Sequence, residues 1–256
     1  MALQIADAIG DGARRAFTYS GGVLMLLMFG YQLLFMGATN TITASLLPAA
    51  RGAANPGFTL PISVGAAAAL AVAGLVAGSV LFVVSVRALT RPQSALGALP
   101  SELFTRRVGR ATLSALGANL VVVVAVVVGF IFLVVPGVFL ALSFLFVVFA
   151  IGVEDERAVD AMRRSWALAS GDRWPLLAVL VVVTVVTSVG SGLGGALSTV
   201  SPVAGQIASI ALSSVLTVVG YGILADAYLQ LCEEKPSDID PDRTAGTDAH
   251  EGDPLA

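Results

Sequence analysis

One uncharged run constrains this chain more than any other feature, because no Asp, Glu, Lys or Arg occurs from Ala111 to Val153. As one straight helix the run would be about 64 Å long, at ~1.5 Å per residue. The hydrocarbon layer of a bilayer is only about 30 Å thick. Since Pro136-Gly137 interrupts the run, we predict a helical hairpin that crosses a membrane, turns at this pair and crosses back.

Four uncharged stretches together predict an all-α, polytopic membrane protein with about six transmembrane helices and short cytoplasmic amphipathic helices. These stretches are Ala16–Ala50, Gly52–Val86, Ala111–Val153 and Trp174–Ala225. The first two are predicted to hold one span each, over residues 17–37 and 62–86. The last would be about 78 Å long as one helix, and it carries turn signals at Val189–Gly195 and at Ser201-Pro202.

The composition agrees with helices in lipid and offers little for chemistry. The chain is 57% hydrophobic and 12% charged, whereas a soluble domain has about a quarter charged residues. The runs are apolar all round, unlike the alternating strands of a water-filled barrel. Cys232 and His250 are the sole cysteine and histidine, too few for a typical zinc site. We therefore expect no catalytic, metal-binding or cofactor-binding residues, and no enzyme activity.

The basic residues predict the orientation of the chain. All of them except Arg51 precede the first span, follow the sixth, or lie between spans two and three or four and five. Positive charge favours the cytoplasmic side, which predicts a multi-pass protein of the cytoplasmic (plasma) membrane with both termini cytoplasmic. The alternative is that Arg14-Arg15 and the apolar run after it form a cleaved signal peptide, but that run is long for one.

The spans divide the chain into three segments. Residues 1–16 are predicted to form a cytoplasmic interfacial helix, 17–232 the six-helix transmembrane domain, and 233–256 a disordered acidic cytoplasmic tail. The tail is rich in Asp, Pro, Gly and Thr and cannot bury enough apolar surface to order itself. An acidic tail with one lysine suggests an organism with a salty interior, although codon bias would also favour arginine over lysine.

Two cytoplasmic segments are predicted to be amphipathic helices. In the first, apolar side chains recur at helical spacing at Leu3, Ala6, Ile9, Ala13 and Phe17. Asp11 and Arg15 stand four apart and can pair. In the second, residues 154–171, one face holds Val159, Met162 and Trp166. Gly171 is predicted to end that helix in the left-handed conformation, and Trp174 to lie at headgroup level.

Several polar or small residues invite a functional reading beside a structural one. Asp226 is the one acidic residue in the apolar part of the last span. It is expected to neighbour a loop arginine rather than serve as a proton relay. The glycines at 190–195 lack the strand that a phosphate-binding loop needs. Gly74 and Gly78 permit close helix approach, within one chain rather than in a dimer.

Six arginines are candidates for binding anionic lipid headgroups; the alternative is that they set topology alone. They are Arg106, Arg107, Arg110, Arg163, Arg164 and Arg173.

The stretch from Val135 to Leu180 carries a specific order of residues. Pro136-Gly137 precedes an apolar span, which is followed by Glu154, by Arg163, Arg164, Ser165 and Trp166, and by Gly171, Arg173 and Trp174. This order resembles the membrane domain associated with glycerophosphoryl diester phosphodiesterases. It is also similar to related uncharacterised membrane proteins of archaea, of the haloarchaeal type. The resemblance implies a multi-span module; the soluble hydrolase barrel of that family has no counterpart here, so hydrolase activity does not carry over.

These observations favour a non-catalytic scaffold or lipid-interacting module whose partners are the lipid bilayer, anionic lipid headgroups and an unidentified protein, with no nucleic acid. A transporter or transporter subunit is the alternative, because two basic cytoplasmic segments each link a pair of spans in a way that hints at a degenerate repeat. An intramembrane enzyme is the least favoured class, because no nucleophile–base pair can be named.

Overall fold

The computed structural model describes residues 4–46, 57–100, 102–105, 108–198 and 201–235, which are helical with short connections and contain no strand. Five helical segments are long and apolar enough to cross a membrane, or up to six if the bent pair α9–α10 is one span. The five are α2 (Tyr19–Leu46), α4 (Val64–Leu89), α6 (Val108–Phe132), the α7–α8 segment (Val134–Val153) and α11 (Pro202–Glu234). The all-α polytopic prediction is confirmed.

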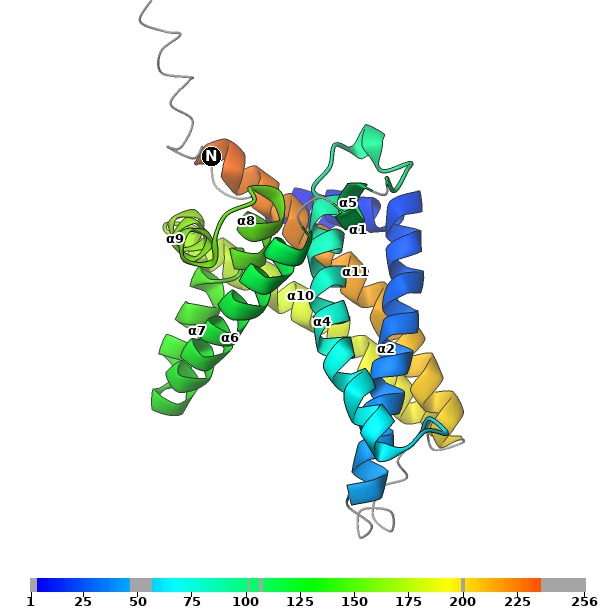
Figure 1. Cartoon of the computed structure of the whole chain (residues 1–256). Coiled ribbons are helices and arrows are strands. Elements are labelled where there is room, and N and C mark those ends of the chain that lie inside the picture. Colours follow the sequence, from blue (N-terminus) through cyan, green and yellow to red (C-terminus); the bar gives the residue numbers. More distant parts are fainter. Residues whose placement is uncertain (1–3, 47–56, 101, 106–107, 199–200, 236–256) are drawn as a thin grey trace, which may run out of the picture.

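The short elements gather at one end of the bundle, which we call the α1 end (Figure 1). It carries α1 (Ile5–Ala16), the 3-10 turn η1 (Gln93–Ala95), α5 (Glu102–Thr105), α9 (Ala158–Ala169) and the last turns of α11. The main core lies close to it and includes Leu89, Phe146, Phe149, Tyr228 and Leu231.

The long helices form two groups that diverge away from the α1 end. In Figure 1, α2 and α4 lie side by side with α11 behind them, whereas α6 and α7 splay to the other side. Their outward faces are apolar, with exposed side chains such as Leu26 on α2, Val72 on α4 and Ile131 on α6. Such a surface would be a liability in water. It is the expected surface of helices in lipid.

The hairpin turn lies earlier than the sequence indicated. α6 ends at Phe132, Leu133 has an extended backbone, and α7 (Val134–Ser143) begins at the next residue. The prediction of a turn at Pro136-Gly137 was therefore wrong, because proline is tolerated in the first helical turn, where its missing N–H has no partner to lose. Gly137 instead lets the two helices touch, since a Cβ on Gly129 would collide with it.

The second limb of the hairpin is broken near the α1 end, which the sequence did not reveal. α7 ends at Ser143 and α8 (Val147–Val153) begins four residues later. The Ser165 hydroxyl of α9 donates to the Ser143 carbonyl at 2.8 Å and accepts from the Phe146 N–H at 3.1 Å. One buried serine thus satisfies both backbone groups that the break exposes.

The glycine-rich stretch Val189–Gly195 does not form a turn. α10 (Arg173–Ser198) runs through it as one helix, so that prediction was wrong, while the predicted break at Ser201-Pro202 is confirmed. Ser201 caps α11 by accepting from the Ala204 N–H, and Pro202 occupies the first helical position. Glycine lowers helix propensity by only about 1 kcal/mol, and a span in lipid must satisfy its backbone internally.

α1 is amphipathic as predicted, but its buried face only partly matches the predicted stripe. Ala8, Gly12 and Ala16 are buried, and Ile9 and Ala13 of the stripe pack against the main core. Ala6 and Phe17 are exposed, and Leu3 lies outside the described residues. The helix packs closely on α11, because a Cβ on Gly12 would collide with the backbone of Ile223.

The corner between α9 and α10 bends by 104°, and Gly171 has φ +95° there, as the sequence predicted. The predicted boundary of the tail was slightly early, since α11 continues to Glu234. Residues 236–256 of the predicted disordered tail lie outside the described residues. The pairing of Gly74 and Gly78 is intramolecular, as expected: they accommodate Phe35 and Tyr31 of α2.

Candidate functional site

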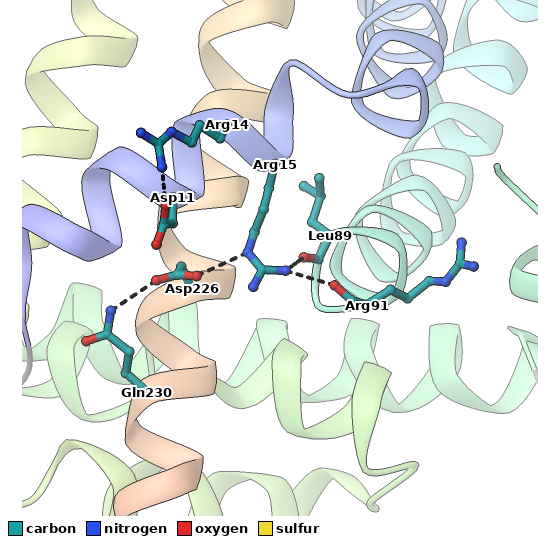
Figure 2. Close-up of polar contacts among 7 residues, drawn as sticks. All are labelled: Asp11, Arg14, Arg15, Leu89, Arg91, Asp226 and Gln230. Carbon is teal, nitrogen blue, oxygen red and sulfur yellow. Dashed lines mark hydrogen bonds and ion pairs between the residues drawn. The ribbon is translucent and has the colours of Figure 1, made fainter. Parts of the chain in front are cut away.

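Arg15 at the end of α1 connects three parts of the bundle through one guanidinium (Figure 2). Its Nε lies 3.1 Å from Asp226 Oδ1 on α11, and the pair is nearly buried. Its Nη1 donates to the carbonyls of Leu89 and Arg91, at 3.2 and 2.8 Å, where α4 ends. Gln230, one turn further along α11, donates to the second Asp226 oxygen at 3.0 Å. The prediction that Asp226 neighbours an arginine is confirmed.

The predicted Asp11–Arg15 pair was wrong. Asp11 pairs instead with the exposed Arg14, three residues away. The side chain of Arg15 is free to leave the surface of α1 because Asp226 offers it a nearly buried carboxylate.

Three further basic side chains at the α1 end repeat the arrangement of Arg15. Arg87 pairs with Asp155 at 2.9 Å and donates to the Gly152 carbonyl near the end of α8. Each of these cations neutralises a carboxylate and satisfies carbonyls that a helix C-terminus leaves without partners.

Arg164 and Lys235 connect α9 and α11 reciprocally: Arg164 of α9 bonds to the end of α11, and Lys235, which follows α11, bonds to the end of α9. Arg164 pairs with Glu154 at 3.4 Å and donates to the Lys235 carbonyl, which follows the last turn of α11. Lys235 pairs with Asp172 at 2.8 Å and donates to the carbonyls of Leu168 and Ser170, where α9 ends. The cations are thus used inside the protein, as ties between helix ends.

Glu154, the acidic residue of the motif, is the centre of a small polar cluster. It accepts a short hydrogen bond from the Tyr228 hydroxyl of α11 and lies against Arg164. The Cys232 sulfur lies 3.8 Å from Arg164 and 3.9 Å from Glu154. With every charge balanced, the cluster is suited to hold α8, α9 and α11 together.

Arg173 differs from the tied cations, although it is half-buried like them. Its guanidinium stacks over the Phe139 ring at 4.2 Å and lies 5.5 Å from the Trp166 ring. Its Nε is buried with no hydrogen-bond partner, and no carboxylate among the described residues pairs with it. Cation–π contact stabilises such a group by about 0.5–2 kcal/mol, but leaves its N–H donors unused.

An apolar groove of about 380 Å³ runs along α7 and α10 from Arg173. Its walls are made by Val134, Val135, Val138, Phe139, Leu142 and Leu177. Trp174, 82% exposed, also borders it. The groove therefore has apolar walls, with the Arg173 guanidinium and the exposed Trp174 indole at its border.

The structure divides the predicted site residues among four places. Glu154, Arg164 and Ser165 lie in internal contacts at the α1 end. Arg173 and Trp174 line the groove, and Trp166 lies beside Arg173 and Phe139. Pro136 and Gly137 lie at the far turn, and Gly171 forms the α9–α10 corner. The predicted arginine cluster is not assembled as one patch. Arg110 and Arg163 are exposed and Arg164 points inward, while Arg106 and Arg107 lie outside the described residues.

The sequence did not single out Arg87, Tyr228 or Cys232 as contact residues, and it gave Arg15 the wrong partner. The sequence did contain one signal for such contacts: a basic residue in the last turn of an apolar helix needs a hydrogen-bond or ion-pair partner if it is buried. Only packing reveals which carboxylate it meets. Among the described residues, no group of three or more His, Cys, Asp or Glu side chains is placed to hold a metal ion.

Comparison with known proteins gives one match. No curated protein and no solved structure matches this sequence. One family, described as a domain of unknown function (DUF7847), matches residues 3–231. This range takes in α1, almost all of α11 and the groove, together with the ion pairs and the Glu154 cluster except for Lys235 and Cys232. Because the match covers most of the chain, the protein belongs to the DUF7847 family.

Proposed function

We propose that this protein is a non-enzymatic, lipid-interacting module of the cytoplasmic membrane. It would hold an anionic phospholipid in the groove between α7 and α10. The observation that carries the proposal is Arg173, a half-buried cation without a carboxylate partner in the described chain, at an apolar groove of about 380 Å³. A phosphate oxygen would accept from its unused donors, and an acyl chain would fill the groove beside it.

The four tied cations at the α1 end support this assignment by contrast, and Arg91, which is also half-buried, donates to the Ala98 carbonyl. Arg15, Arg87, Arg164 and Lys235 each meet a carboxylate within 3.4 Å. They have no need of a lipid phosphate. The exposed indole of Trp174 beside the groove suits the headgroup level of a bilayer.

Lipid binding to Arg173→Gln and to Arg163→Gln tests this assignment. Arg163 is the matched control, because it is exposed on α9 and lies outside the groove. Native mass spectrometry would follow titration with phosphatidylglycerol and phosphatidylcholine. Loss of a charge-assisted hydrogen bond of about 1.5–3 kcal/mol should weaken phosphatidylglycerol binding by roughly tenfold or more in Arg173→Gln. Arg163→Gln should bind like the wild type.

Two outcomes would contradict the lipid assignment. One is equal loss of phosphatidylglycerol in both arginine variants, which would indicate general electrostatic attraction. The other is unchanged binding in Arg173→Gln.

The proposed orientation places the α1 end and both termini in the cytoplasm, and the arginine distribution supports it. Cys232 provides the test, because it is the sole thiol and lies half-buried near the end of α11. A membrane-impermeant maleimide should label it in inverted vesicles and not in intact cells. Labelling in intact cells would reverse the orientation.

A transporter, or a subunit of one, is the second candidate, and a polar cavity between the long helices favours it. Solute flux in proteoliposomes, with Asp226→Asn as a comparison, tests it.

We also propose that the order of motif residues in 135–180 reflects a distant relation to the phosphodiesterase-associated membrane domain. The same proposal includes an archaeal, halophilic origin, which the acidic tail supports. A scaffold would bind an unidentified protein, and capture from detergent extracts tests that role.

A further inference from the structure

A cavity of about 300 Å³ lies at mid-depth between four of the long helices. Tyr31 and Gln32 line it from the middle of α2, Phe82 from α4, Asn119 from the middle of α6, and Thr217 and Tyr221 from α11. In Figure 1, α4 stands between α2 and α6, with α11 behind it. Its volume is at the lower end of the range for small-molecule sites.

The polar groups around this cavity are largely without partners. Within the described part of the chain, the side chains of Tyr31, Asn119, Thr217 and Tyr221 make no hydrogen bond to another residue. Gln32 accepts from the Ser213 hydroxyl at 2.9 Å through its amide oxygen, so its two N–H donors remain available. Polar groups at this depth are costly unless something satisfies them. Asn119 is exposed and the other four are half-buried, so their unused donors are open to a molecule that enters the cavity.

The chemistry of the lining restricts what can bind. None of the described residues that line the cavity is charged, so an ion there would lack a counter-charge in a region where charge is expensive. The amides of Gln32 and Asn119 and the two phenols can all donate, from helices on different sides of the cavity. The rings of Phe82 and Tyr221 stack at 4.8 Å and offer a flat wall.

Access to the cavity is from the lipid. Leu75, which lines the cavity, is 57% exposed, and Val72 and Val76 of the same helix are exposed beside it. A molecule reaching the site through this surface must dissolve in hydrocarbon. Sugars and ions are therefore poor candidates.

We propose that this cavity binds a flat, uncharged ring compound with carbonyl acceptors on opposite edges, of the quinone class. The carbonyls would accept from donors on α2 and on α6 or α11, and the ring would lie near Phe82 and Tyr221. This site is separate from the α7–α10 groove, so neither proposal depends on the other.

The probe is menadione, titrated into the purified protein in nanodiscs. Equilibrium dialysis measures the bound menadione, and the amount taken up by empty nanodiscs is subtracted as the lipid background. Tyr31→Phe removes the hydroxyl, which is the Tyr31 atom closest to Gly78, and keeps the ring carbons behind it. Asn119→Leu removes the amide on α6. Each should weaken binding about fivefold, as expected for one neutral hydrogen bond. Thr184→Val is the matched control, since that hydroxyl bonds within α10, away from the cavity, and it should leave binding unchanged.

Charge selectivity provides the second arm. The anion 1,4-naphthoquinone-2-sulfonate, similar in ring size, should bind at least tenfold more weakly than menadione. The proposal is overturned if menadione does not bind above the nanodisc background. It is also overturned if the two cavity variants bind it like Thr184→Val, or if the sulfonate binds equally well.

Discussion

Arg14 and Arg15 are neighbours in sequence, yet replacing them should affect stability very differently. Arg15→Met removes the hydrogen bonds to Asp226, Leu89 and Arg91, and leaves the Asp226 carboxylate with Gln230 as its remaining partner. Breaking a buried ion pair from one side costs about 3–5 kcal/mol. Because the Arg15 and Asp226 side chains are 11% and 10% exposed, the lower end applies, about 3 kcal/mol.

Arg14→Met is the matched control. The Arg14 side chain is 79% exposed and pairs with Asp11 on the surface of the same helix. Exposed pairs contribute about 0–1 kcal/mol. The difference between the two methionine variants should therefore be about 2 kcal/mol or more.

Asp226→Asn separates charge from hydrogen bonding. The amide oxygen can still accept from Arg15, and Arg15 keeps its two carbonyl acceptors, so the guanidinium loses its counter-charge but keeps its hydrogen bonds. The expected cost is about 1.5–2 kcal/mol, the value of losing the charge in such a bond. The double variant Arg15→Met/Asp226→Leu should cost less than the sum of its single changes, because neither partner remains to be desolvated.

The assay is reversible unfolding in mixed detergent micelles, with helicity followed by circular dichroism as the fraction of denaturing detergent rises. Arg14→Met and Arg15→Met within about 0.5 kcal/mol of each other would refute the reasoning. Arg15 would then contribute to orientation alone.

Three further changes test the packing and the loop charges. Gly12→Ala should lower the free energy of unfolding by about 1–3 kcal/mol, because the new Cβ would meet the backbone of Ile223. Gly10→Ala is the control and should not lower it, because the space around Gly10 is open. Thermal unfolding of both variants measures the difference. Gly171→Ala should cost about 1–3 kcal/mol from its positive φ; an unchanged midpoint would mean that the corner relaxes. Burial, and then neighbouring carboxylates, raise the pKa of Glu156 above 4.5. Its stabilising contribution is therefore present below pH 4.5 and lost as the pH rises through the folded pKa. Glu156→Gln should raise the midpoint at neutral pH, with no gain below pH 4.5.

Local patterns predicted most of the secondary structure and failed at two kinds of place. Hydropathy identified the long helices, because a span of apolar residues has few other solutions in lipid. Pro136 and the glycines at 190–195 are weaker signals inside a membrane than in water, since lipid stabilises the backbone hydrogen bonds that they weaken. The break between α7 and α8 had no local signal, because Ser165 satisfies it from another helix.

The candidate site was predictable in its residues and not in its contacts. The motif pointed to Glu154, Arg164 and Arg173. The pattern of charges along the sequence, however, does not distinguish among Arg163, Arg164 and Arg173. The structure gives Arg164 a carboxylate, leaves Arg163 exposed and stacks Arg173 on Phe139. The polar lining of the mid-depth cavity comes from four helices, so no window of sequence contains it.

The sequence by itself determined that this chain is helical and built for a membrane, because hydropathy sums over neighbouring residues and needs no knowledge of packing. Tertiary structure alone decided which cations become internal ties and that Arg173 instead stacks on aromatic rings. Arg15 and Asp226 are far apart in the chain, and their 3.1 Å contact exists only because α1 packs closely enough on α11 at Gly12.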